Sequence, residues 1–137
     1  MPHITVRFSD GINSINSINP ADSGEGRPLL ELAAQLQDAV VTIADGRLEG
    51  CRVHFPSGEG SAWVIAGEEE GAKQAVHVEI AIKAGRTDEV KARLSQAALD
   101  VLRTYLPPAA DYETYLSVEV REIDPVGYVS HVEPRKD

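Results

Sequence analysis

The sequence has a single cysteine, Cys51, among its 137 residues. One cysteine cannot form a disulfide within the chain, and it cannot supply the several thiolates of a multi-cysteine zinc site. Long apolar runs are also missing, since no segment approaches the roughly 20 apolar residues that a membrane-spanning helix needs. The first residues lack the apolar core and the small-residue cleavage site of a signal peptide. We therefore expect a soluble, cytoplasmic protein.

Basic residues are scarce as well. Thirteen Lys and Arg stand against 22 Asp and Glu, which gives a formal net charge of −9 at pH 7. This balance argues against a protein that tracks nucleic-acid phosphates or docks on an anionic membrane. An anionic small molecule would need a local cationic pocket to overcome the overall field. The four histidines are scattered without the spacing of a helical metal site, and the sequence has no Gly-rich phosphate loop.

What is present fits one globular domain over residues 1–137, because 42% of the residues are hydrophobic and 26% are charged. Apolar alternation predicts four strands, and helical spacing predicts one helix that begins at Pro28 and another that follows Thr87. This order predicts an α+β fold, β-α-β-β-α-β, with a four-stranded sheet and both helices on one face. The opposite face then needs a partner subunit. The predicted strands are 3–8, 51–55, 75–82 and 116–121, with a mobile loop at 9–27 and a C-terminal tail at 125–137.

Proline directly follows the initiator methionine. Met1 before a small residue is normally removed during synthesis, which would leave Pro2 with a free secondary amine. Such an amine, placed in a low-dielectric pocket near guanidinium groups, loses affinity for its proton and can act as a general base near neutral pH. By itself Pro2 carries little weight, because a great many proteins have proline at this position.

Several other stretches of the sequence strengthen the case that Pro2 is a functional residue. They are Met-Pro-His-Ile-Thr-Val at 1–6, Arg-Val-His at 52–54, the strand 77–82 followed by Lys-Ala-Gly-Arg-Thr, and Leu-Ser-Val-Glu-Val-Arg-Glu-Ile-Asp-Pro at 116–125. In this order and spacing they resemble the 5-carboxymethyl-2-hydroxymuconate isomerase family of the tautomerase superfamily. In the segments that lie between these stretches, the similarity to the family is poor. The resemblance implies a tautomerase-like fold, a homotrimer, an N-terminal proline base, and no metal or organic cofactor.

The resemblance also implies a reaction. Family members interconvert dienol and keto forms of unsaturated di- and tricarboxylic acids in aromatic compound degradation, and arginines bind the carboxylates. Carried onto this chain, Pro2 is the catalytic base, and Arg86 and Arg52 match the family's Gly-Arg-Ser/Thr and Arg-Val-His motifs as substrate-binding residues. The sequence departs from the family at Gly50, where the family carries an arginine. Arg47, in the preceding loop, is the candidate to fill that gap.

Two other functions are compatible with the same residues. One is a non-catalytic trimeric protein that binds a small carboxylate or a partner on this fold. The other is a related tautomerase that acts on a different keto acid, which the departure at Gly50 makes plausible. A buried pocket that joins Pro2 to Arg86 and Arg52 would favour catalysis, whereas a filled or solvent-flooded Pro2 would favour binding.

Overall fold

The structure, a computed structural model, describes residues 2–8, 27–56, 64–65, 68–69, 73–106 and 113–136. Its centre is a four-stranded sheet in the order β2-β1-β5-β6. Strand β1 is parallel to β2 and antiparallel to β5, and β5 is parallel to β6. The strands are β1 (His3–Phe8), β2 (Arg52–His54), β5 (Lys73–Lys83) and β6 (Glu113–Ile123), beside a small second sheet of β3 (Val64–Ile65) and β4 (Glu68–Glu69).

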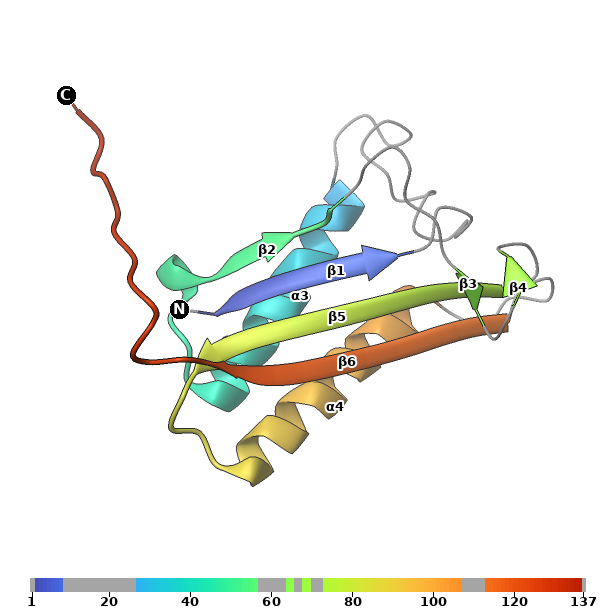
Figure 1. Cartoon of the computed structure of the whole chain (residues 1–137). Helices are drawn as coiled ribbons and strands as arrows, with labels where there is room; N and C mark the ends of the chain where they lie inside the picture. The colour runs from blue at the N-terminus through green and yellow to red at the C-terminus, as the bar shows by residue number, and fades with distance from the viewer. Residues whose placement is uncertain are drawn as a thin grey trace.

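Two helices, α3 (Arg27–Ala44) and α4 (Asp88–Tyr105), cover one face of this sheet (Figure 1). Helix α4 begins at Thr87, whose hydroxyl accepts the Val90 N–H at 3.2 Å, as the sequence predicted for an N-cap. Helix α3 ends before Asp45, which adopts the left-handed conformation with φ 57° that commonly follows a helix end. The predicted α+β fold, with two helices on one face of four strands, is confirmed.

The hydrophobic core lies between the sheet and the two helices. Alternate residues of each strand face the helices, so that Ile4 and Val6 in β1 and Val78 and Ile80 in β5 are at most 1% exposed. The core is therefore closed by packing, and a ligand site must lie at its margin. The other large contributors are Leu32, Leu36, Val40, Val76, Ile82, Leu94, Ala98 and Leu102.

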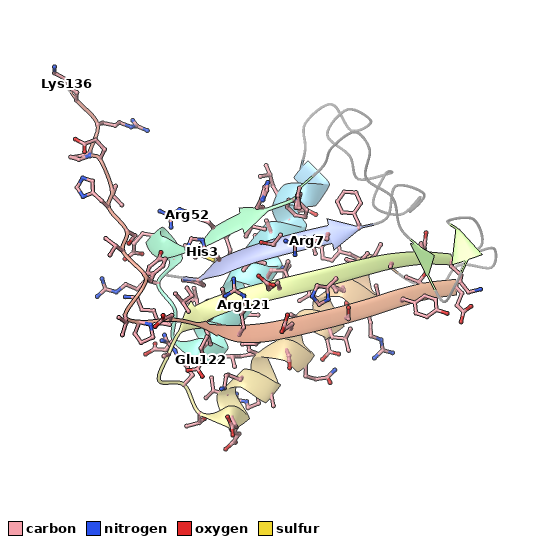
Figure 2. The ribbon with its side chains drawn as sticks, in the orientation of Figure 1. His3, Arg7, Arg52, Arg121, Glu122 and Lys136 are labelled. Atoms are coloured by element: carbon pink, nitrogen blue, oxygen red, sulfur yellow. The ribbon has the colours of Figure 1, made fainter. Side chains whose placement is uncertain are left out.

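The opposite face of the sheet is polar and no described helix covers it. It carries His3, Arg7, Arg52 and Arg121 (Figure 2). Arg121 Nε lies 3.0 Å from a Glu79 carboxylate oxygen on the neighbouring strand. This face is the one for which the sequence predicted a partner subunit.

The two predicted irregular segments have different outcomes. The loop expected at 9–27 lies outside the described residues, except that Arg27 is the first residue of α3. From Pro125 to Lys136, the described part of the predicted tail, the chain has no strand or helix. This tail extends from the end of β6 past the amino-terminal end of β1 (Figure 1). Neither of the two long helices in the described part of the chain is apolar enough to span a bilayer.

Candidate active site

Pro2 is buried where β1 begins, beneath the C-terminal end of α3. Its carbonyl accepts the Arg52 N–H at 3.1 Å, so strand β2 fixes the start of β1. The loop after α3 approaches closely, because Gly46 has no side chain. A Cβ placed there would lie 2.8 Å from Val40 Cγ1 and 3.5 Å from Pro2 Cγ. Glycine at position 46 therefore allows this loop to pack against Val40 of α3, beside the proline ring.

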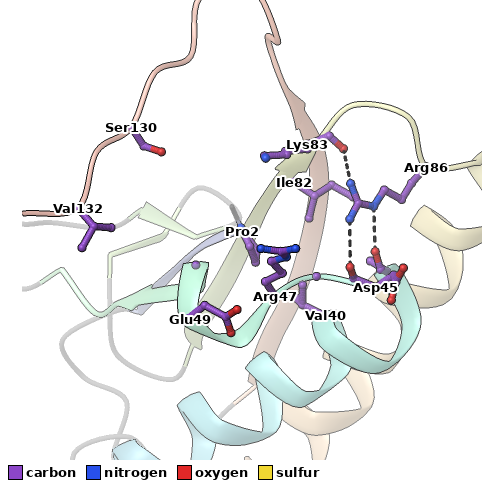
Figure 3. Close-up of a pocket in the computed structure, with 13 residues that line it drawn as sticks. Pro2, Val40, Asp45, Arg47, Glu49, Ile82, Lys83, Arg86, Ser130 and Val132 are labelled. Atoms are coloured by element: carbon purple, nitrogen blue, oxygen red, sulfur yellow. Dashed lines mark hydrogen bonds between the residues drawn. The ribbon is translucent and has the colours of Figure 1, made fainter. Parts of the chain in front are cut away.

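A cavity of about 410 Å³ opens beside Pro2 (Figure 3). Its walls come from the end of α3 and the loop that follows, from the end of β5, and from the C-terminal tail. Three cationic side chains and two acidic ones line it, which gives a formal charge of 3 − 2 = +1 in a chain whose net charge is −9. This is the local cationic pocket that an anionic ligand requires here. The charged residues are Arg47, Lys83, Arg86, Asp45 and Glu49.

Arg86 caps the C-terminal end of α3 with its guanidinium group. Nε donates to the Ala44 carbonyl at 2.8 Å, and the two terminal nitrogens donate to the carbonyls of Asp45 and Lys83, each at 3.4 Å (Figure 3). Carbonyls at a helix C-terminus lack intrahelical partners and form the negative end of the helix dipole. A guanidinium has five N–H donors, and these bonds use three of them. Arg86 therefore joins the end of α3 to the end of β5 while it also lines the cavity.

The turn that carries Arg86 is held by Glu122 on β6. Gly85 in this turn has φ +116°, a conformation that favours glycine, and its N–H donates to Glu122 Oε2 at 3.2 Å. The other oxygen of Glu122 accepts from the Lys91 ammonium at 3.2 Å. The Gly85 N–H, and then Lys91, lower the pKa of the Glu122 carboxyl below its usual value. Glu122 therefore helps to place Arg86, although it does not line the cavity.

We expect Glu122→Gln to lower kcat/KM of the activity proposed below about two- to ten-fold, because the loss of charge weakens the hydrogen bonds that hold the Gly85–Arg86 turn. The stability difference from the wild type should also depend on pH. The folded state lowers the Glu122 pKa, so its stabilisation is present above the ordinary value of 4.5 and is lost as pH falls through the lowered pKa. Thermal melting between pH 7 and pH 3 should show the two proteins converging in acid.

Glu31→Gln is the matched control, because this exposed carboxylate lies on α3, does not line the cavity, and is not on the sheet face that awaits a partner. It should leave kcat/KM within about two-fold of the wild type, as surface substitutions away from a site usually do. A stability gap for Glu122→Gln that stays constant down to pH 3 would contradict the role assigned to this carboxylate.

The two other predicted substrate-binding residues are in different places. Arg47, which follows α3, lines the cavity, and its side chain points toward Pro2 (Figure 3). Arg52 in β2 is outside the cavity lining and lies on the polar sheet face beside His3. One of its terminal nitrogens donates to the Gly50 carbonyl at 3.4 Å. The structure thus brings Pro2, Arg47 and Arg86 together and leaves Arg52 apart from them.

Sequence reasoning missed Lys83, the last residue of β5, which adds the third cation to the cavity. The signal was present, because this lysine lies between the predicted strand 75–82 and the Ala-Gly-Arg turn. The contribution of the tail through Ser130 and Val132 was also missed. Within the described ranges, no group of three or more His, Cys, Asp or Glu side chains is arranged to hold a metal ion.

No protein-family model matches the sequence, and no curated protein matches it. Solved structures do match the fold. A 5-carboxymethyl-2-hydroxymuconate isomerase from Deinococcus radiodurans R1 is 23% identical with a TM-score of 0.71, over 96% of this chain and 90% of that one. A 5-carboxymethyl-2-hydroxymuconate delta-isomerase is 19% identical with a TM-score of 0.69, over 96% and 89%. A fused 4-OT, described as a symmetric trimer, is 26% identical with a TM-score of 0.59, over 88% and 85%.

These likenesses are consistent with the element order seen here. The chain has the tautomerase fold, and its structural neighbours include the isomerases that the sequence resembles. At these identities the comparison concerns the fold, so the chemistry must be argued from the residues around Pro2.

Proposed function

We propose that this chain is a cofactor-independent tautomerase, with the N-terminal proline as general base. Its substrate is an unsaturated di- or tricarboxylic acid of the 5-carboxymethyl-2-hydroxymuconate type, interconverted between dienol and keto forms. The observation that carries the proposal is the position of Pro2, buried at the wall of a cavity with a formal charge of +1 in a chain of −9.

The site favours a neutral proline amine. After removal of Met1, the nitrogen of Pro2 is a secondary amine at a buried position, and Arg47, Lys83 and Arg86 line the same cavity. Burial and nearby positive charge both disfavour the protonated form of an amine. A base with a pKa near the working pH transfers protons most effectively. The three cations outnumber the two acids of the cavity, Asp45 and Glu49, so these surroundings lower the affinity of the Pro2 nitrogen for a proton.

The reaction needs one proton to be removed and one to be returned. Pro2 takes the proton from the 2-hydroxyl or an adjacent carbon of the substrate, which leaves a dienolate with its charge spread over oxygen and carbon. The same nitrogen then returns the proton at another carbon, so the substrate is rearranged without net gain or loss of atoms or electrons. Cationic donors fixed near the developing negative charge lower the barrier.

We assign substrate binding to Arg47, to Lys83 and to the remaining N–H donors of Arg86. Planar guanidinium groups match carboxylates with paired hydrogen bonds. Arg52 lies on the sheet face for which we propose a partner subunit in a homotrimer, so it stays a candidate only across a subunit interface. The symmetric-trimer neighbour supports assembly of this fold into oligomers.

The test is turnover of a 2-hydroxymuconate-type dienol by protein whose mass shows that Met1 has been removed. We expect the ultraviolet absorbance of the dienol to change rapidly at protein concentrations far below that of the substrate. A matched sample with one extra residue before Pro2 should be inactive, because its proline nitrogen is a non-basic amide. If protein with a free Pro2 amine shows no turnover, the proposed substrate class is wrong, and a tautomerase of a different keto acid or a small-carboxylate-binding protein takes its place.

A further inference from the structure

The cavity beside Pro2 carries two acidic side chains as well as its three cations. Asp45 directly follows the end of α3, and Glu49 lies in the short 3-10 helix η1 (Leu48–Gly50). In Figure 3 these two side chains flank Arg47. A carboxylate in the wall of an anion site weakens the binding of any anion placed beside it, since like charges repel. The two acids therefore restrict which anions the cavity can hold.

Neither of these carboxylates is neutralised within the described part of the chain. Arg86 donates to the backbone carbonyl of Asp45, at 3.4 Å, and not to its carboxylate. Among the described residues, neither Asp45 nor Glu49 has an ion pair. Both residues are exposed, so water screens their charges and each acts only on a group close to it. We therefore expect a modest effect from each, felt by the part of a ligand that lies beside it.

The cations that a ligand can reach are enough for two carboxylates. The side chains of Arg47 and Lys83 have no hydrogen bond or ion pair with any residue that the structure describes, so both can bind a ligand. Arg86 keeps the N–H donors that do not cap α3. One carboxylate at Arg47 and a second shared by Lys83 and Arg86 would occupy these groups. A third carboxylate would be left beside an acid.

We propose that Asp45 and Glu49 are specificity-determining residues that exclude a third carboxylate and so restrict the substrate to a dicarboxylic acid. This inference rests on the proposed function, from which it takes the position of the two carboxylates at the cations. The substrate group that faces the two acids is uncharged and carries an N–H or O–H donor, because an ionised carboxylate only accepts hydrogen bonds. Gly50 also lines the cavity, where the family that the sequence resembles has an arginine, and it adds no cation to offset the two acids.

Three unreactive acids with one carbon skeleton test the exclusion without catalysis: glutarate, 3-carbamoylglutarate and tricarballylate. The last two carry a neutral amide and a carboxylate of nearly the same size at the same carbon, so they separate charge from bulk. By calorimetry we expect the wild type to bind tricarballylate about four- to 20-fold more weakly than 3-carbamoylglutarate, the combined effect of two screened like charges. Asp45→Asn together with Glu49→Gln should reduce this difference to about two-fold or less.

Glu31→Gln together with Asp38→Asn is the matched control, because it removes the same charge from exposed positions on α3 that do not line the cavity. It should keep the wild-type preference for the amide. Asparagine readily adopts the left-handed conformation of Asp45, so the turn after α3 should persist, which thermal melting checks. If the double variant does not fold, Glu49→Gln alone leaves this turn untouched and should reduce the difference about two- to four-fold.

Equal affinity of the wild type for 3-carbamoylglutarate and tricarballylate, or a preference for tricarballylate, would overturn the exclusion. A wild-type preference that persists in the folded variants would overturn it as well. Both results would leave the proposed function intact, since turnover of a dicarboxylic dienol tests that function separately. A preference for the amide without turnover of any dienol would support the exclusion and count against the proposed function. If the wild type binds none of the three acids, both proposals are wrong.

Discussion

Replacement of Pro2 by alanine is expected to lower kcat about 100- to 10,000-fold, the range that a positioned general base contributes. After removal of Met1, alanine offers a primary amine on a chain end that is free to rotate, whereas the pyrrolidine ring fixes its nitrogen and the backbone φ angle. The ring also packs at the end of the core, close to Gly46. Without the pyrrolidine ring, the primary amine of alanine would not be held in the position of the proline nitrogen.

Steady-state kinetics on the dienol, with the mass of each protein verified, checks this expectation. KM should change much less than kcat, because the carboxylate-binding side chains stay in place. Pro56→Ala is the matched control, since Pro56 follows β2 and does not line the cavity. It should retain turnover within about two-fold of the wild type. Unchanged turnover in Pro2→Ala would show that another group is the base.

Arg86→Ala is expected to produce two separate losses. The first is a decrease of about 1–3 kcal/mol in the free energy of unfolding, because the carbonyls of Ala44, Asp45 and Lys83 lose their donors. The second is a decrease of about 100-fold in kcat/KM, typical of the removal of one donor that stabilises a developing oxyanion. Arg86→Lys should recover little of either, because an ammonium cannot reproduce the planar set of donors.

Thermal or urea unfolding, combined with kinetics, separates the two roles of Arg86. A loss of stability with only a small change in substrate affinity would leave Arg86 as a helix cap and refute its part in anion binding. Unchanged stability would refute the capping role. Arg103→Ala is the control, because this exposed arginine lies in the last turn of α4, away from the cavity. It should change the free energy of unfolding by no more than about 0.5 kcal/mol.

Local patterns in the sequence were sufficient for the secondary structure. The alternation from Ala75 to Ile82 predicted β5, which is longer by two residues at the start and one at the end. Thr87 predicted the start of α4, and Pro28 predicted the start of α3 to within one residue. Each of these signals acts between residues a few positions apart, so it can be interpreted without knowledge of the rest of the fold.

The site could be predicted only in part. Sequence motifs gave Arg86 and Arg52 the same weight, yet Arg86 lines the cavity and Arg52 lies outside its lining. The difference comes from sheet register and facing: Arg52 is paired with His3 on the polar face, whereas Pro2 lies at the edge of the helix-covered side. No local pattern reports which face of β2 will meet the end of α3.

By itself, then, the sequence determined the order of strands and helices, the covered and uncovered faces of the sheet, and Pro2 as the residue to examine. Only the tertiary structure decided that Arg47 and Lys83 join Arg86 around Pro2, and that a tail far along the chain lines the same cavity through Ser130 and Val132. The guanidinium of Arg86 bonds to a carbonyl 42 residues earlier in the chain. Such contacts depend on how separate elements dock, and periodicity within an element carries no information about docking.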